Sequence, residues 1–350
     1  MWRAMVTGLA LLVLGVGIMG GLARQPEPEP EPASAAPATM RFFDPEAPDE
    51  CDAWRPIERW TPPEDGRRVV VLIHGLDEPG SVWNALGPAL ARADFPTVRI
   101  DYPNDQAIAR SAEQVAGQLD RLGAGAMGIS HAAIVAHSMG GLVIMDALTR
   151  PGLDRTGWPD VDRLITLGTP AAGSPLARFQ PLTELREQAI RAMADGHLDR
   201  RDLERFAEDG RGGAAADLEP GSDFLTDLAK RDPPTGTAIT AVVGRLDTPD
   251  SGEIRDEILD ILPDQIGDDG AAVTLASDLG RWASHWLDRA ATLAGDGIVP
   301  EGSAEGFWTE DVVRVSATHR AMIEAADCPA DPQHEPPAVA IVLDRLGRDR

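Results

Sequence analysis

Short apolar runs alternate with segments of helical periodicity from residue 67 onward, and this alternation constrains the fold more than any other feature. Val69–Ile73 is an unbroken run of β-branched and aliphatic residues, typical of a strand buried on both faces. From Ile108 to Leu122 apolar residues recur every three or four positions, which predicts a helix. The pattern indicates a mostly parallel sheet with helices on both faces. Further strands are predicted over 97–101, 132–136, 163–167, 238–243 and 312–315, and a helix over 139–149.

Residues 1–24 form a separate hydrophobic unit. Arg3 precedes an apolar stretch from Ala4 to Leu22, and small residues follow where a signal peptidase would cleave. As a helix this stretch would be about 28 Å long, close to the thickness of the hydrocarbon core of a bilayer. A cleaved signal peptide and a retained membrane anchor are both open. Either one predicts export to the periplasm, the extracellular space or the cell envelope.

A linker is predicted over residues 25–50. The alternating prolines and glutamates of residues 26–32 form an extended, charged segment that has nothing to bury. One globular domain is predicted over 51–350, with two insertions rich in charge and helix formers at about 175–234 and 247–294. Insertions above such a sheet commonly form a cap over a binding site, and solvated helical excursions are the alternative.

Charge and cysteine content limit the classes of partner. The formal net charge of −25 argues against nucleic acid and anionic membrane surfaces, because phosphate binders need basic surfaces. Cys51 and Cys328 could pair in an oxidising compartment, and two unpaired thiols are the alternative. No Cys/His cluster indicates zinc, so neither a metal nor an organic cofactor is predicted. A calcium site among the acidic residues from Asp247 to Asp269 is the alternative to a solvated helix face.

The segment IVAHSMGG at 134–141 carries the predicted chemistry. Ser138 stands between a predicted strand and a predicted helix, and Ala136 and Gly140 beside it are small enough for a sharp turn. Such a turn lifts the hydroxyl above the sheet and places a backbone N–H of the helix N-terminus beside it. Ser138 is therefore the predicted nucleophile. His137 lies on the strand side of the turn, where its ring does not reach the front of Ser138.

Three short motifs resemble those of bacterial lipases and related α/β-hydrolases. AHSMGG at 136–141 is similar to their nucleophile elbow, with alanine where the usual G-x-S-x-G pattern has its first glycine. VLIHGL at 71–76 is similar to their strand and oxyanion turn, and GTPAAGS at 168–174 to a turn of lipase-like hydrolases. The resemblance covers roughly residues 67–324 and implies the α/β-hydrolase fold with helical cap insertions. It further implies an oxyanion hole formed by the backbone N–H groups of Leu76 and Met139, supported by His74, Gly75 and Gly140.

The resemblance also implies the base and the acid of a catalytic triad. His319 follows the last predicted strand, where this fold delivers its histidine, and a packing or surface histidine is the alternative. Asp296 lies in GDGIVP at 295–300, which resembles the segment that carries the triad acid in many lipases. Asp247 follows the preceding strand, where simpler α/β-hydrolases place their acid. We prefer Asp296 on this resemblance, and turn aspartates are the alternative for both.

These residues together predict a serine hydrolase that cleaves carboxylic esters through an acyl-enzyme, and the resemblance implies acyl-lipid-like substrates. The partner is then a small-molecule or lipid ester, and the N-terminal segment could add a membrane tether. An acyltransferase, a thioesterase or a lipid-headgroup deacylase would use the same triad. A tethered, non-catalytic binding protein is the alternative of another class. The intact set of Ser138, His319 and Asp296 argues against it.

Overall fold

The chain divides into two units, Met1–Glu31 and Pro32–Arg350, and all described residues belong to the second. The computed structural model describes residues 37–63, 68–76, 78, 80–123, 127–175, 213–247, 274, 277, 281, 284–285, 292–326 and 335–348. The predicted signal or anchor segment and the Pro/Glu run lie outside these residues. None of the described helices combines the length and the apolar character that a membrane span needs.

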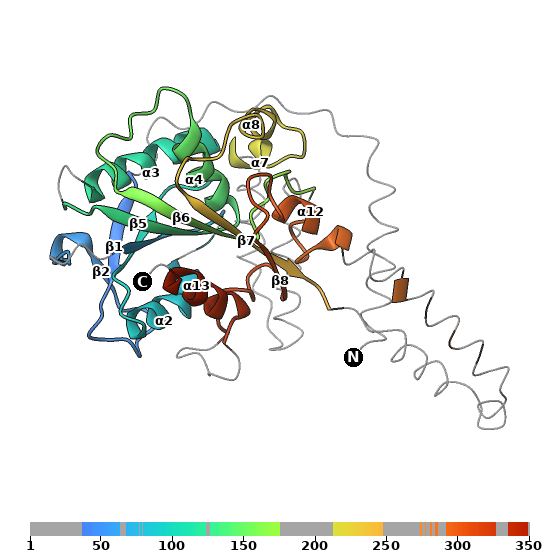
Figure 1. Cartoon of the computed structure of the whole chain (residues 1–350), viewed down its shortest axis with the longest axis horizontal. Helices are drawn as coiled ribbons and strands as arrows, with labels where there is room; N and C mark the ends of the chain where they lie inside the picture. The colour runs from blue at the N-terminus through green and yellow to red at the C-terminus, as the bar shows by residue number, and fades with distance from the viewer. Residues whose placement is uncertain are drawn as a thin grey trace, which may run out of the picture. The chain divides into compact units, whose positions relative to one another are not determined.

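An eight-stranded sheet forms the centre of this unit (Figure 1). Its strands lie in the order β2-β1-β4-β3-β5-β6-β7-β8. The six strands from β4 to β8 are parallel, and β1 is antiparallel to both of its neighbours. This topology confirms the predicted α/β architecture. The strands are β1 Thr39–Phe43, β2 Trp54–Pro56, β3 Val69–Ile73, β4 Thr97–Asp101, β5 His131–His137, β6 Asp160–Leu167, β7 Ala238–Arg245 and β8 Val312–Ser316.

Helices cover both faces of the sheet (Figure 1). Helices α3 and α4 pack against each other on one face, and α2 and α13 lie together on the other. The alternation of side chains along β3 explains both cores: Val69, Val71 and Ile73 join the first, and Val70 and Leu72 join the second. The helices are α2 Leu86–Arg92, α3 Ile108–Leu122, α4 Met139–Thr149, α7 Gly213–Asp217, α8 Asp223–Leu228, α12 Glu301–Ala304 and α13 Pro337–Gly347, with 3-10 turns η1 Ile57–Arg59 and η2 Gly80–Trp83.

The structure corrects one part of the predicted domain organisation and leaves other parts outside the described residues. The predicted linker over 25–50 is too long, because Thr39–Phe43 forms β1 and pairs with β2 and β4 inside the sheet. The first predicted insertion contains α7 and α8, while residues 176–212 lie outside the described residues. Most of the second insertion also lies outside them, including the acidic segment considered for calcium. Cys51 is buried and disulfide-bonded, and Cys328 lies outside the described residues.

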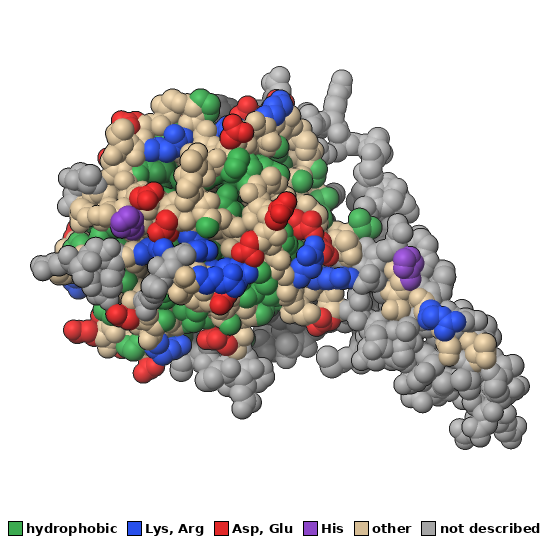
Figure 2. Space-filling model, in the orientation of Figure 1, with side chains coloured by type: hydrophobic (Ala, Val, Ile, Leu, Met, Phe, Trp, Pro, Cys, Tyr) green, Lys and Arg blue, Asp and Glu red, His purple; other side chains and the backbone are tan. Residues whose placement is uncertain are grey.

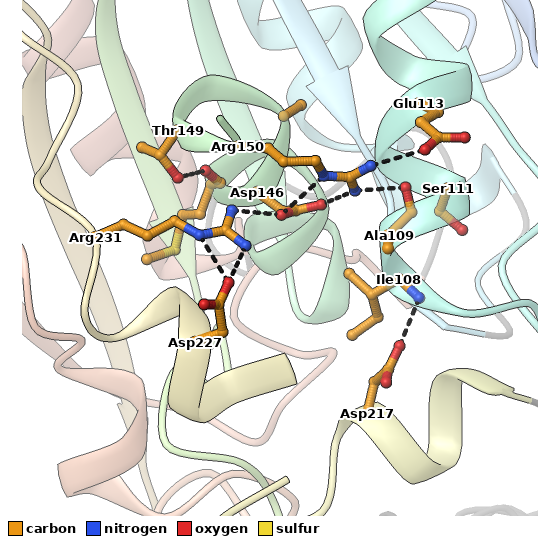
Figure 3. A network of polar contacts seen from close by, with 12 residues as sticks. Ile108, Ala109, Ser111, Glu113, Asp146, Thr149, Arg150, Asp217, Asp227 and Arg231 are labelled. Carbon is orange, nitrogen blue, oxygen red and sulfur yellow. Dashed lines mark hydrogen bonds and ion pairs between the residues drawn. The ribbon is translucent and has the colours of Figure 1, made fainter. Parts of the chain in front are cut away.

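The part of the first insertion that is described is tied to α3 and α4 by ion pairs (Figure 3). Asp146 of α4 is 1% exposed and accepts hydrogen bonds from both Arg150 and Arg231. Arg231, just after α8, also pairs with Asp227 of that helix. Asp217 of α7 accepts a hydrogen bond of 2.8 Å from the backbone N–H of Ile108, the first residue of α3. The insertion is thus held against the helix that follows Ser138.

The order of the central strands determines where a site can form. The chain leaves β3 through α2 to reach β4 on one side, and returns through α3 to β5 on the other side of β3. The segments that follow β3 and β5 therefore lie next to each other at the carboxyl edge of the sheet. Parallel sheets bind ligands at such a reversal of strand order. Ser138 and the His74–Gly75 turn both lie there.

Candidate active site

Ser138 occupies a strained turn between β5 and α4. Its φ of 54° and ψ of −130° lie in a region that side chains rarely adopt, at a cost of roughly 1–3 kcal/mol. Ser138 N–H donates to Leu167 O of β6 at 2.8 Å, which fixes the turn to the sheet. Gly140 must lack a side chain, because a Cβ there would lie 2.4 Å from His74 O. The small residue predicted at Gly140 therefore lets α4 approach the end of β3.

The structure brings Ser138, His319 and Asp296 into one hydrogen-bonded line. His319 Nε2 lies 2.8 Å from Ser138 Oγ, and His319 Nδ1 lies 2.7 Å from Asp296 Oδ2. His319 is 5% exposed and Asp296 is 1% exposed, so water competes little for these bonds. Since a carboxylate only accepts, Nδ1 carries the proton and Nε2 is the basic nitrogen that faces the serine. An imidazole so oriented can take the proton of Ser138.

Asp296 is held in place by the backbone around it. Its Oδ1 accepts hydrogen bonds from the N–H groups of Ile298 and Val299, at 3.0 and 2.8 Å, which leaves Oδ2 for His319. His319 N–H in turn donates to Asp296 O at 3.0 Å. The alternative acid, Asp247, is exposed and accepts a hydrogen bond from Ser316 Oγ instead. Of the two carboxylates, Asp296 is the one that meets His319.

Two glycines that we did not single out make room for this line. A Cβ at Gly168 would lie 3.0 Å from Asp296 Oδ2 and 3.1 Å from His319 Nδ1, and Gly168 also has a φ of +58°. A Cβ at Gly244 in β7 would lie 2.6 Å from Asp296 Cβ. Gly168 opens the GTPAAGS motif, so that motif was a signal for close packing against the acid and the base. No sequence motif marked Gly244 as a position of close packing.

The turn after β3 is oriented by three polar side chains. His74 Nδ1–H donates to Gly75 O at 2.8 Å, and Asn104 Nδ2–H donates to the same oxygen at 3.2 Å. Tyr102 stacks on the His74 ring, with centroids 4.5 Å apart, and donates its hydroxyl proton to His74 O at 2.7 Å. Burial, and then the charge of Glu78, raise the pKa of Tyr102, which keeps that proton in place. His74 therefore supports the turn through its ring.

Orienting the Gly75 carbonyl also orients the next amide. A trans peptide is planar, so the Leu76 N–H points opposite to Gly75 O. Within the part of the chain that the structure describes, the N–H groups of Leu76 and Met139 have no hydrogen-bond partner. The turn also lies against the serine, since a Cβ at Gly75 would be 2.6 Å from Ser138 Cβ. Two amides without a described partner, on segments next to Ser138, are available as oxyanion donors.

A second buried carboxylate and histidine, Glu78 and His137, lie next to His319. Sequence reasoning missed the role of both. Glu78 Oε1 lies 2.5 Å from His137 Nδ1, and Glu78 Oε2 accepts a hydrogen bond from Gly75 N–H at 2.5 Å. Burial raises the pKa of Glu78, but His137, His319 and the Gly75 N–H outweigh it and lower the pKa to about 2. His137 is fully buried, and its Nε2 donates to His319 O at 3.0 Å.

Glu78, His137 and His319 are also the described residues that could hold a metal ion, because their ligand atoms lie within 4.8 Å of one another. In the structure those atoms already have partners. Both ring nitrogens of His319 face Asp296 and Ser138, and both of His137 face Glu78 and a carbonyl. The four ring nitrogens therefore already lie against polar groups, although the Nδ1–H of His137 is not directed at Glu78 as in a hydrogen bond.

Comparison with known proteins bears on the fold. A family model for the alpha/beta hydrolase family matches residues 70–331. The lipase BlEst2 of Bacillus licheniformis in its propeptide form has a TM-score of 0.51 and 16% identity, over 81% of this chain and 51% of that chain. The metagenomic carboxyl esterase MGS0156 has a TM-score of 0.48 and 16% identity, over 84% of this chain and 80% of that chain. None of the curated proteins matches the chain.

The likeness to the BlEst2 lipase, at 16% identity, supports the fold alone. The family model, in contrast, matches well over half of the 350 residues and spans Ser138, Asp296 and His319. The sheet order and the strained serine turn agree with that match. The chain therefore belongs to the alpha/beta hydrolase family.

Proposed function

We propose that this protein is a serine hydrolase that cleaves carboxylic esters through an acyl-enzyme. The observation that carries the proposal is the line from Ser138 Oγ through His319 to Asp296, with contacts of 2.8 and 2.7 Å. Ser138 is the nucleophile, His319 the general base and Asp296 the residue that orients the imidazole. The N–H groups of Leu76 and Met139 form the oxyanion hole.

The reaction follows from these roles. Ser138 Oγ attacks the ester carbonyl while its proton passes to His319 Nε2, and the carbonyl oxygen becomes an oxyanion between the two amides. The tetrahedral intermediate collapses, the C–O bond to the alcohol breaks, and His319 returns the proton to the leaving alcohol. Water then attacks the acyl-enzyme with His319 as base. Asp296 stabilises the imidazolium each time and keeps Nδ1 protonated.

The substrate class we propose is apolar esters of the acyl-lipid kind. The motifs that resemble those of lipases and the two large insertions support this choice over an open site for small polar esters. The proteins with a similar fold include a lipase and a carboxyl esterase, which is consistent with it. The described part of the first insertion lies against α3 and α4, next to the segment that carries Ser138 (Figure 3).

Two measurements test the reaction and the substrate class. A fluorophosphonate probe should label the wild-type protein and leave Ser138→Ala unlabelled. Hydrolysis of p-nitrophenyl esters of graded chain length should favour medium or long acyl chains, more so above the micelle concentration of the substrate. Labelling that survives Ser138→Ala would remove Ser138 as nucleophile. Labelling without hydrolysis of any ester, thioester or acyl transfer to an added alcohol would contradict ester cleavage.

We also propose that residues 1–24 export the enzyme. The proposal rests on Arg3, the apolar stretch behind it and the charged linker that follows. Fractionation of cells expressing the full chain should find the activity outside the cytoplasm. Sequencing of the N-terminus separates a cleaved signal from a retained anchor. Activity confined to the cytoplasm would contradict export.

A further inference from the structure

Glu78 and His137 are buried polar residues that the ester-cleavage mechanism does not use. Glu78 is 8% exposed and His137 fully buried, and they come from two different segments of the chain. Glu78 follows the oxyanion turn after β3, and His137 ends β5 beside Ser138. A buried charged or polar group costs stability unless its partners are all in place. The stability of the fold therefore depends on each contact of this pair.

The number of protons on the His137 ring depends on the two groups that its nitrogens face, a backbone carbonyl and a carboxylate. His137 Nε2 faces the carbonyl oxygen of His319 at 3.0 Å, and a carbonyl oxygen only accepts. His137 Nδ1 lies 2.5 Å from Glu78 Oε1, out of hydrogen-bond geometry for its N–H, and two bare lone pairs at that separation would repel each other. Glu78 Oε2 meanwhile accepts from Gly75 N–H at 2.5 Å, as a carboxylate does. A proton on each ring nitrogen of His137 would make the pair an imidazolium with a carboxylate.

The same contacts join the two halves of the site. One end of the chain of hydrogen bonds is Gly75 N–H, one residue before the Leu76 amide of the oxyanion hole. The other end is the backbone carbonyl of His319, whose ring faces Ser138. The rings of His137 and His319 also pack together, with centroids 4.7 Å apart. A shift of either loop would have to break a short buried contact.

We propose that Glu78 and His137 form a buried carboxylate–imidazolium pair that positions the oxyanion turn and the His319 loop relative to Ser138. The inference rests on the proposed function, since the two loops are described by their roles in ester cleavage. Neither residue touches the reacting atoms, so both are positioning residues. The groups that face the pair are His319, Tyr102 and the Gly75 N–H.

Hydrogen-bond accounting distinguishes two substitutions of Glu78. In Glu78→Gln the amide oxygen can accept from Gly75 N–H and the amide N–H can donate to a neutral His137 Nδ1, while Nε2–H still donates to His319 O. Every contact is kept and both charges are lost. In Glu78→Ala the Gly75 amide and the His137 ring lose their shared partner. Alanine should therefore disturb the position of both loops, and glutamine should restore most of it.

The protonation state can be read without any activity. In full-length protein labelled with [15N]histidine, at pH 8, the His137 ring should show two N–H groups in the wild type and one in Glu78→Gln. The resonance is assigned by its loss in His137→Asn, or, if that variant does not fold, as the one histidine whose protonation differs in Glu78→Gln. A neutral His137 in the wild type would overturn the ion pair even if the enzyme is active.

Kinetics on a p-nitrophenyl ester test the positioning role. Glu78→Ala should lower kcat about 10- to 100-fold with KM within about threefold, because binding is kept while the oxyanion amide and the base are misplaced. The kcat of Glu78→Gln should be about tenfold higher than that of Glu78→Ala. His131→Phe, at the exposed opposite end of β5, and Glu58→Ala, an exposed carboxylate, are the matched controls and should match the wild type.

Two kinetic outcomes would overturn the proposal. One is a folded Glu78→Ala with wild-type kcat. The other is an equal loss in Glu78→Ala and Glu78→Gln, which would assign the effect to charge and not to the hydrogen-bonded position. Failure of the proposed function shows differently: wild type and all variants would then lack ester hydrolysis and fluorophosphonate labelling, while the [15N]histidine spectrum would still report the pair.

Discussion

Gly75 is the residue at which backbone geometry and chemistry are most tightly coupled. An added Cβ would lie 2.6 Å from Ser138 Cβ and 2.9 Å from Glu78 Oε2. Ser138 is already strained and cannot yield, so Gly75→Ala should push the oxyanion turn away from the nucleophile. We expect kcat to fall by about 100-fold, with a destabilisation of roughly 1–3 kcal/mol. Steady-state kinetics and urea unfolding measure the two effects.

The control for this substitution is Gly117→Ala in α3. No atom lies within 4 Å of a Cβ there, and alanine is favoured over glycine inside a helix by about 1 kcal/mol. That variant should keep full activity and unfold at slightly higher urea. Unchanged kcat in Gly75→Ala would show that the turn does not depend on its approach to Ser138.

The low pKa of Glu78 predicts how stability depends on pH. A carboxyl whose pKa falls from 4.5 to about 2 on folding stabilises the folded state above pH 4.5, and this contribution is lost as pH falls toward 2. Over that window the wild type should lose up to about 1.4 kcal/mol per pH unit from this group. Urea unfolding at pH 7, 5, 4 and 3 measures the loss. A stability that does not fall between pH 5 and 3 would contradict the shifted pKa.

Residues within motifs could be predicted, and residues that act across motifs could not. Ser138, His319 and Asp296 each lie in a local pattern, and the structure brings them together. Glu78 and His137 depend on the contact between the segments after β3 and β5, which no local pattern encodes. The sequence shows Glu78 only as one acidic residue in a turn. Its importance comes from its burial.

At the scale of elements, the buried Asp146 is the point at which the first insertion is fixed to α4. Arg150 and Arg231 both pair with it, and each is mostly buried (Figure 3). Asp146→Ala leaves two partly buried cations without their shared carboxylate, but Arg150 keeps Glu113 and Arg231 keeps Asp227, so we expect a loss of roughly 1–3 kcal/mol. Urea unfolding checks the magnitude. Because α4 begins beside Ser138, ester hydrolysis should also fall.

Asp227→Ala is the matched control for Asp146→Ala. Asp227 pairs with the same Arg231, but its side chain is 66% exposed and water screens the pair, so Asp227→Ala should have only a small effect on stability. Equal effects of the two substitutions would show that burial of Asp146 does not determine its contribution.

The elements that sequence reasoning missed include β1 and β2 at one edge of the sheet and helices α2 and α13 on one of its faces. Helix α13 begins at Pro337 and buries Ala338, Val339, Val342 and Leu346, a helical spacing that was readable in the sequence. Strand β1 was harder to find because it follows the proline-rich run directly, and its five residues alternate between exposed and buried only in part. The central strands were predictable because burial on both faces requires continuous apolar runs.

At the scale of the whole molecule, the formal net charge of −25 does not make the surface uniformly acidic. On the face in Figure 2, basic side chains gather in a band across the middle with acidic side chains among them. Ion pairs of this kind include Arg345 with Asp311, which joins α13 to the segment before β8. Hydrogen bonds from Arg345 are the main reason why the pKa of Asp311 is lowered to about 2.

The disulfide of Cys51 is the covalent constraint at this scale. Cys51 precedes β2 at one edge of the sheet, and the sequence contains a single other cysteine, Cys328, which precedes α13. A bridge between them would close a loop that contains most of the domain, and removal of such bridges typically costs about 2–5 kcal/mol. Reduction should therefore lower the urea midpoint of the wild type and leave Cys51→Ser/Cys328→Ser unchanged. A peptide map without reductant should contain the linked Cys51 and Cys328 peptides. Alkylation of both thiols in the native, unreduced protein would contradict the bridge, and with it one argument for an oxidising compartment.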